Sequence, residues 1–311
     1  MNLRTFMILM STVAAIALVA TSSFAQAASG LAYQFTHSVN DDPFPSPDGP
    51  QIVYISVIEG KEQIFIMKAD GTASRQITRD AANHESPAWS PDGTKIAYVS
   101  DRNGHSVIYM LNPDGSGEER LTSETGESIH PNWSPDSKSV IFCTDDDLYP
   151  PYKNDSQVFS VDIKTKETKL LIGNGTNTYP SWSPDGKKIV FRRMIGEMNS
   201  EVFLKDGDNE VNLSHHPAFD GWPSWSPDGK LIAFSSNRRS NYQIFVMDAD
   251  GSNVRLVANT EGRATEPRWS PDGKQIIFPI CKKVDFGSDC QIYVAPAPAS
   301  PPAPTASTHS P

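Results

Sequence analysis

The sequence W-S-P-D-G at residues 89–93 decides the fold, because it occurs four times in full in one chain and twice more with one residue changed. The other copies, complete or with one residue changed, stand at 45–49, 133–137, 182–186, 225–229 and 269–273. From the first copy to the last, successive copies are 44, 44, 49, 43 and 44 residues apart. A turn that recurs at a nearly constant interval indicates that the chain repeats one structural unit six times.

One unit, residues 87–122, contains turns and strands but no helical pattern. Ser-Pro-Asp-Gly fits a type I β-turn, in which proline sets φ at the second position and glycine occupies the fourth. β-Branched and aromatic residues at 95–100 and 107–111 predict two strands, and the charged stretch 119–122 predicts an outermost one. Four antiparallel strands per unit form one blade of a β-propeller. We therefore expect an all-β, six-bladed β-propeller.

A tryptophan opens five of the six turns. These residues are Trp89, Trp133, Trp182, Trp225 and Trp269. A four-stranded sheet buries its faces only against neighbouring blades, so we interpret the tryptophans as core residues between blades and not as a ligand-binding row. Two units depart from the pattern. Pro45 replaces tryptophan in the first, and Ser137 replaces glycine in the third, where a positive φ would be unfavourable.

The sixth unit lacks a fourth strand of its own, since residues 291–294 lead directly into a proline-rich stretch. Residues 33–36 (Y-Q-F-T) resemble residues 75–78 (R-Q-I-T), which precede the second turn. We expect this N-terminal strand to complete the last blade and close the ring, because closure removes an open sheet edge.

The two ends of the chain lie outside the repeat. Residues 1–27 begin with a basic residue, continue with an apolar run and end in Ala-Gln-Ala, the pattern of a secretory signal peptide. The apolar run is shorter than the roughly 20 residues that span a bilayer. We expect a periplasmic or secreted protein that does not span the membrane after cleavage. Residues 28–295 would form the propeller, and residues 296–311, mostly Ala, Pro, Ser and Thr, a disordered tail.

The net charge of −10 argues against a nucleic-acid partner, because binding phosphates requires clustered lysine and arginine. Cys281 and Cys290 are separated by eight residues and are expected to form a disulfide in an oxidising compartment. Cys143 lies in an apolar run and is expected to be a small buried side chain.

The repeat resembles the TolB-type propeller repeat. In the fifth unit P-x-W-S-P-D-G-x-x-I-A-F occupies residues 223–234 and Q-I-F-V-M-D-A-D-G residues 243–251, and the similarity extends over about residues 31–295. The resemblance implies a six-bladed propeller without catalytic machinery, acting in a periplasmic envelope system. TolB also has an N-terminal domain, which we expect to be absent here. The same repeats form the non-catalytic propellers of prolyl-oligopeptidase-type peptidases, so a stand-alone relative of those is an alternative.

Equivalent positions that differ in chemistry are where we expect a site. The residues directly before each unit's opening proline are Asp42, Ser86, His130, Tyr179, Trp222 and Glu266. In a propeller this connection lies at one mouth of the central channel. Acids, an imidazole and two aromatic rings could bind a peptide or a small ligand there. Ordinary variation of exposed loops explains the same pattern.

Further binding candidates fall in loops expected on the same face. The longest insertion, residues 145–152, contains Tyr149 and Tyr152, which suit a protein contact. Its three adjacent aspartates could hold Ca²⁺, although they lack the alternating spacing of a calcium loop. Arg192 and Arg193 fall in the equivalent region of the fourth unit. They could meet an acidic partner or balance neighbouring acids.

An enzymatic alternative depends on four histidines that precede strand-opening prolines. They are His84, His130, His215 and His216. Metal-dependent oligogalacturonate-type lyases built on similar propellers hold a transition metal with histidines, but no spacing in this sequence brings four ligands to one ion. The expected function is therefore a non-enzymatic, monomeric platform without a cofactor, which binds another envelope or secreted protein. The lyase is the alternative.

Overall fold

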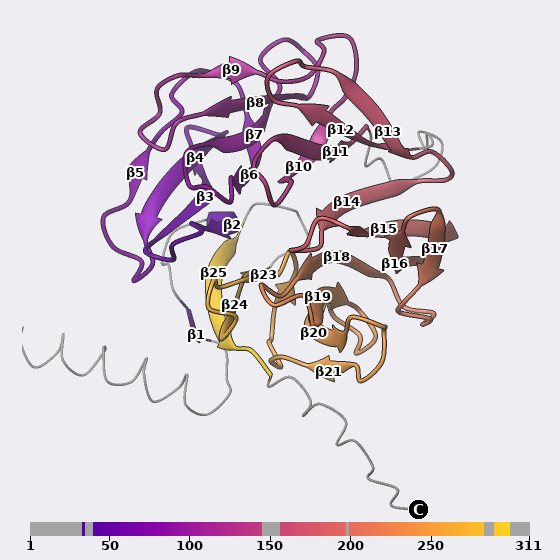
Figure 1. Ribbon diagram of the computed structural model, residues 1–311. Coiled ribbons are helices and arrows are strands. Elements are labelled where there is room, and N and C mark those ends of the chain that lie inside the picture. The colour runs from indigo at the N-terminus through magenta and orange to yellow at the C-terminus, as the bar shows by residue number, and fades with distance from the viewer. Residues whose placement is uncertain (1–32, 35–39, 145–155, 197–198, 283–288, 299–311) are drawn as a thin grey trace, which may run out of the picture.

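Six β-sheets stand around a common axis in the computed structural model (Figure 1). The described residues are 33–34, 40–144, 156–196, 199–282 and 289–298. Within them all regular structure is β-strand, so the predicted six-bladed all-β architecture is confirmed. In this part of the chain no helix could cross a membrane.

Three sequence predictions fall on residues that are not described. They are the signal peptide at residues 1–27, the loop tyrosines Tyr149 and Tyr152 with their neighbouring aspartates, and the tail beyond Pro298. The described residues do not test them, so they stay predictions.

Blades one to three are four-stranded antiparallel meanders whose strands follow chain order. Blade one comprises β2 (Asn40–Pro45), β3 (Gln51–Ile58), β4 (Lys61–Lys68) and β5 (Arg75–Gln76). Blade two comprises β6 (His84–Trp89), β7 (Ile96–Ser100), β8 (Val107–Leu111) and β9 (Glu119–Arg120). Blade three comprises β10 (Ile129–Trp133), β11 (Ser139–Cys143), β12 (Val158–Asp162) and β13 (Thr168–Ile172).

Blades four and five repeat this plan, and blade six modifies it. Blade four comprises β14 (Asn177–Trp182), β15 (Lys188–Gly196), β16 (Asn199–Asp206) and β17 (Asn209–Asn212). Blade five comprises β18 (Asp220–Trp225), β19 (Leu231–Ser236), β20 (Gln243–Asp248) and β21 (Arg255–Leu256). In blade six the first strand is divided into β22 (Arg263–Ala264) and β23 (Arg268–Trp269), followed by β24 (Gln275–Cys281), β25 (Cys290–Pro296) and β1 (Tyr33–Gln34).

The outermost strand of blade six comes from the N-terminal part of the chain. In β1, Tyr33 lies opposite Val294 of β25, and Gln34 lies opposite Tyr293. Figure 1 shows β1 beside the last strand. The pairing joins two distant segments of sequence, and how much it stabilises the ring stays a prediction.

The repeated turn is held by local hydrogen bonds. In blade two Gly93 N donates to Ser90 O at 2.9 Å, and Ser90 Oγ donates to Asp92 Oδ1 at 2.7 Å. Gly93 has a φ of +74°, which glycine adopts without steric strain. In blade three Ser137 takes this position with a φ of 59°. Its hydroxyl accepts a hydrogen bond from Asp92 N at 3.1 Å, which offsets part of the strain.

The motif tryptophans pack between blades, as predicted. Four of them are 4–9% exposed, namely Trp89, Trp133, Trp225 and Trp269, whereas Trp182 is half-buried. Trp133 Nε1 donates to Ala88 O of the preceding blade at 2.9 Å, and Trp269 Nε1 donates to Ser224 O at 3.2 Å. Between blades six and one, where the tryptophan is missing, the layer contains Ile52, Tyr54, Met67, Ile277, Ile292 and Val294.

Candidate functional site

Six equivalent residues line the central channel where the first strand of each blade is interrupted. They are Asp42, Ser86, His130, Tyr179, Trp222 and Glu266, and we call them the ring. All six have φ between 46° and 52°, in the left-handed region that L-residues seldom adopt. In blades one to five the pairing of the first two strands shifts register at this point. In blade six the first strand is divided there. The structure thus brings together the residues predicted from sequence.

The space inside the ring is narrow. Its cavity measures about 20 Å³, which accommodates about one water molecule. The ring is therefore a constriction of the channel and not a pocket for a drug-sized ligand. Its side chains separate into an aromatic half on blades three to five and an acidic half on blades six and one.

The aromatic half is a continuous stack. The His130 and Tyr179 rings are 3.6 Å apart between centroids, and the Tyr179 and Trp222 rings are 5.5 Å apart. The guanidinium of Arg192 lies 4.6 Å from the Tyr179 centroid and 5.3 Å from that of Trp222. Burial, and then the positive charges of Arg192 and Arg268, hold the pKa of His130 well below its usual range. His130 is therefore neutral at pH 7.

Arg192 and Arg193 do not form a basic surface. Arg192 is fully buried, and its Nε donates to Thr178 Oγ1 at 2.8 Å. Arg193 Nη2 is 2.7 Å from Glu210 Oε2. The prediction that Arg192 could meet an acidic partner from the loop face is wrong, because its side chain is buried and its guanidinium packs against Tyr179 and Trp222. Arg193 instead balances a neighbouring acid, Glu210, which was the other alternative.

The acidic half contains two carboxyl groups that share a hydrogen bond. Burial, followed by the negative charges of Asp42 and Asp41, raises the pKa of Glu266 well above its usual value. Burial also raises the pKa of Asp42, although Arg268 acts against it, with Nη2 3.8 Å from Asp42 Oδ1. One proton can be shared between such neighbouring carboxyls because both resist ionisation together.

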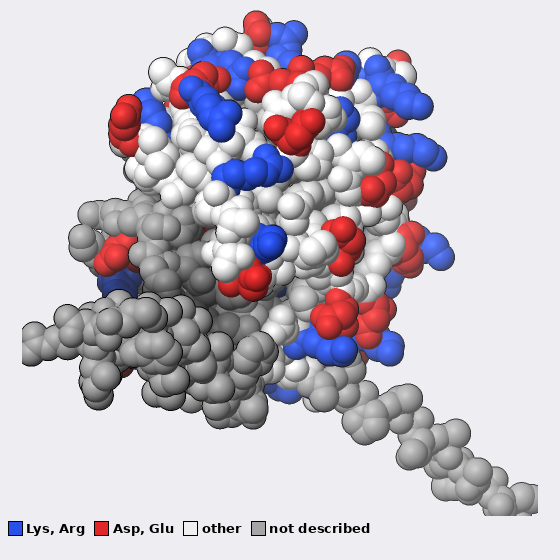
Figure 2. Space-filling model, turned by 90° about the vertical axis from the view of Figure 1, so that its left-hand side faces the viewer, with Lys and Arg blue, Asp and Glu red and all other residues white. Residues whose placement is uncertain are grey.

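Three more carboxyl groups lie near the first residues of β2, β4 and β6, and we call Asp41, Glu62 and Glu85 the acidic mouth. Burial, with the charges of Asp42 and Glu62, raises the pKa of Asp41 to about 7. Burial also raises the pKa of Glu62, which shares a hydrogen bond with Glu85. On the outer side of the propeller, by contrast, acidic and basic side chains are interspersed (Figure 2).

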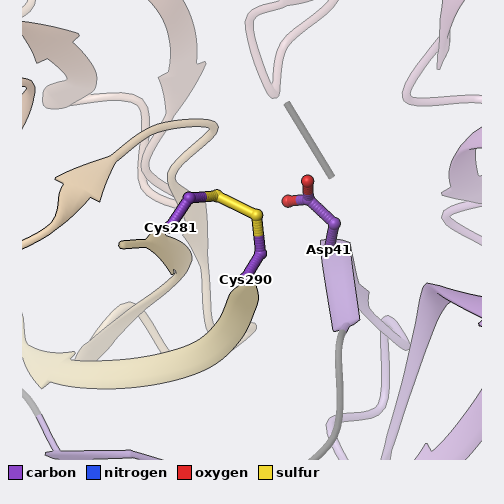
Figure 3. A group of neighbouring side chains, drawn as sticks. All are labelled: Asp41, Cys281 and Cys290. Carbon is purple, nitrogen blue, oxygen red and sulfur yellow. A yellow bond between two sulfur atoms is a disulfide. The ribbon is translucent and has the colours of Figure 1, made fainter. Parts of the chain in front are cut away.

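A disulfide borders the acidic mouth. Cys281 and Cys290 lie directly opposite each other on β24 and β25 and are bonded, as predicted. The carboxyl of Asp41 is directed toward them (Figure 3). This trio is the only group of three potential metal ligands within 4.8 Å of one another among the described residues. The two sulfurs are bonded to each other, so the trio in this state offers no thiolate for a metal.

The four candidate metal-binding histidines are not brought together in the described structure. His84 is fully buried, and its Nε2 forms a hydrogen bond of 2.8 Å with Asp80 Oδ1. His215 is exposed, and His216 Nδ1 accepts a hydrogen bond from Ala218 N at 3.1 Å. His130 belongs to the aromatic half. These four histidines were candidates only for the lyase alternative, and in the described structure they do not share a site.

The other end of the channel is wider, and the sequence reasoning missed it. This turn-side cavity has a volume of about 420 Å³ and is lined by motif tryptophans from five blades and by the proline of all six turns. The prolines are Pro47, Pro91, Pro135, Pro184, Pro227 and Pro271. Asn132 and Arg268 border both this cavity and the ring. The recurrence of proline at one turn position was the signal that could have predicted an apolar lining.

Solved structures of similar fold include TolB proteins and an enzyme. The putative TolB from Agrobacterium tumefaciens matches with a TM-score of 0.63 and 24% identity, over 84% of this chain and 91% of that one. TolB from Acinetobacter baumannii matches with a TM-score of 0.63 and 23% identity, over 83% and 63%. Oligogalacturonate lyase from Vibrio parahaemolyticus matches with a TM-score of 0.58 and 12% identity, over 86% and 93%. At these identities the likeness concerns the fold.

No curated protein matches the sequence. The family model of the TolB beta propeller domain, however, matches residues 25–149 and 149–295, which together include all six blades. The expected resemblance is thus confirmed on the repeats that carry it. This chain belongs to the TolB β-propeller domain family.

Proposed function

We propose that this chain is a non-catalytic binding module of the cell envelope, and that its acidic mouth receives a basic segment of a partner protein. The observation that supports this proposal is the gathering of carboxyl groups at one end of the channel. Asp41, Asp42 and Glu62 belong to blade one, Glu85 belongs to blade two, and Glu266 lies between β22 and β23 of blade six. These three blades are consecutive around the ring.

Crowded carboxylates favour a cation because each one raises the energy of ionising the next. Burial is the main cause of the raised pKa values of Asp41 and Glu62, and the negative charge of Asp42 raises both further. A lysine or arginine side chain entering the mouth would offset it. Arg263 already acts in this way, since its charge lowers the pKa of Asp41.

The ring side chains support binding more than catalysis. His130 is neutral and stacked on Tyr179, and Arg192 is held against two aromatic rings. Such groups act as walls, because a general acid or base needs access to a substrate proton. The TolB family match favours the same reading, and the histidines required by the lyase alternative lie apart from one another.

The stacked blades give the mouth a rigid frame. Each blade is fixed to its neighbours by a buried layer, so several loops are presented together with little loss of freedom when a partner binds. The predicted signal peptide and the TolB resemblance favour a periplasmic location. Tyr149 and Tyr152 remain candidates for contacts beside the mouth.

A basic peptide tests the proposal directly. Binding of a six-arginine peptide should weaken about tenfold, equivalent to about 1.4 kcal/mol, in a Glu62→Gln/Glu85→Gln variant when measured by isothermal titration calorimetry. The control variant Glu167→Gln/Asp208→Asn removes the same charge from exposed turns elsewhere and should bind as the unchanged protein does. Equal weakening in both variants would show a general charge effect and contradict the site.

Capture of partners from an envelope extract then tests the biological claim. The unchanged protein and the Glu167→Gln/Asp208→Asn control should retain the same partner, and the Glu62→Gln/Glu85→Gln variant should lose it. Retention by all three would rule against the acidic mouth as the contact surface.

A further inference from the structure

The turn-side cavity has the properties of a site for a proline-rich segment. Its volume of about 420 Å³ falls within the range of ligand pockets, and indole and pyrrolidine rings line it. Aromatic-lined grooves bind proline-rich chains in the polyproline II conformation, whose rings pack on the aromatic faces and whose order is largely present before binding. No acidic side chain lines the cavity among the described residues, and Arg268 is its one charged border.

The chain itself contains such a segment. Residues 299–311 read A-S-P-P-A-P-T-A-S-T-H-S-P, with four prolines and no lysine, arginine, aspartate or glutamate. Small uncharged residues between the prolines can enter an apolar cavity without a charge being desolvated. The composition therefore matches the lining.

The path of the chain leads toward this end of the channel. After β25, Ala297 N donates to Lys274 O at 2.8 Å, which holds the chain beside the turn of blade six. Ala297 and Pro298 then line a groove of about 510 Å³ between blades five and six. Pro227, Trp269 and Pro271 also line that groove, and the same three residues line the turn-side cavity.

We infer that residues 299–311 dock into the turn-side cavity of their own propeller. In a polyproline II conformation these residues extend by about 3.1 Å each, or roughly 40 Å in total. The segment is therefore long enough to enter the cavity from Pro298, which lines the neighbouring groove. Polyproline II has no internal hydrogen bonds, which leaves its carbonyl oxygens able to accept from Asn132 and Arg268 at the cavity floor.

Attachment to the same chain makes even a weak contact significant. A short tether gives an effective concentration of about 1 mM, so a segment with an intrinsic Kd of about 100 μM would occupy the cavity roughly ten times more often than not. The cavity would then be filled at the end of the channel opposite the acidic mouth. A proline-rich partner would have to displace the segment, whereas a basic partner at the mouth would not.

Competition between the attached segment and a free copy tests this inference. The probe is a synthetic peptide of residues 296–311, titrated into the full chain and into a variant that ends after Pro298, with tryptophan fluorescence as the readout. The shortened variant should bind the peptide about tenfold more tightly than the full chain. A peptide with every proline replaced by alanine should not bind.

Two substitutions locate the contact. In the shortened variant Pro184→Ser/Pro227→Ser changes two exposed prolines that line the cavity, and peptide binding should weaken at least fivefold. The control Leu170→Ala alters a residue that is 49% exposed on β13 and should leave binding unchanged. Equal affinity of the full and shortened chains, or binding of the alanine peptide, would overturn the inference. So would a fluorescence difference between the two chains that grows with protein concentration, because the occupant would then be a second copy.

Discussion

Replacing Asp41 with asparagine should stabilise the protein at neutral pH and leave its stability near pH 4 unchanged. Burial and the charges of Asp42 and Glu62 raise the pKa of Asp41 from 3.8 to about 7 in the folded protein. In the unfolded chain the carboxyl keeps its ordinary pKa. Between these two values the folded state retains a proton that the unfolded state releases, so the free energy of unfolding falls as the pH rises. Asparagine carries no such proton.

The size of the effect follows from the same pKa. Each unit of pKa displacement corresponds to about 1.4 kcal/mol, which sets an upper limit of roughly 4 kcal/mol at pH 8. Asp41 is half-buried and titrates together with Asp42 and Glu62, so we expect a gain of about 1–3 kcal/mol. Asparagine can still accept the hydrogen bond that Asp42 N donates at 2.9 Å. The substitution therefore removes a charge and preserves the local geometry.

Urea unfolding at pH 4, 6 and 8, followed by tryptophan fluorescence, measures this gain. The control Asp208→Asn removes an exposed carboxylate between β16 and β17 and should show no comparable rise at pH 8. An advantage of Asp41→Asn that is the same at pH 4 and pH 8, or a loss of stability at pH 8, would refute the raised pKa of Asp41 in the folded protein.

Five further changes probe the fold. Phe234→Ala removes a side chain that is 0% exposed in blade five and should lower the free energy of unfolding by about 3–5 kcal/mol in urea titrations. Ser137→Ala should destabilise by about 1 kcal/mol, since the hydroxyl accepts a backbone hydrogen bond from blade two, whereas Ser137→Gly should be nearly neutral because it also relieves a positive φ. Deleting residues 28–37 should lower the melting temperature by several degrees in calorimetry, because it removes β1, which pairs with β25 on the side away from β24. Replacing Cys281 and Cys290 with serine should cost about 2–3 kcal/mol, and reductant should then have no further effect on unfolding.

The repeat made the architecture predictable from sequence. Ser-Pro-Asp-Gly specifies its turn through bonds within five residues, as Ser90 and Gly93 show, so the same letters give the same structure in every blade. The tryptophan layer was predictable because a blade can bury an apolar face only against its neighbours. The disulfide was predictable from the short spacing of Cys281 and Cys290 and from the expected oxidising compartment.

The site was predictable only in part. The six positions of the ring could be aligned by counting from the turn, but their left-handed backbone and the narrowness of the space between them arise when six blades meet. Arg192 illustrates the difficulty. Adjacent arginines in a sequence predict a basic surface, yet Arg192 is buried against the aromatic half of the ring and Arg193 pairs with Glu210. The turn-side cavity likewise exists only after the prolines of all six turns converge.

The shared backbone of the ring has a consequence for how such proteins diversify. Holding an L-residue in the left-handed region is unfavourable by about 1–2 kcal/mol, and the surrounding blades bear this penalty whichever side chain is present. A change of side chain at a ring position therefore leaves the packing of its blade unchanged. Over generations, a propeller of this kind can exchange an acid for an imidazole or an indole at its axis, one blade at a time, and acquire a new binding preference without refolding.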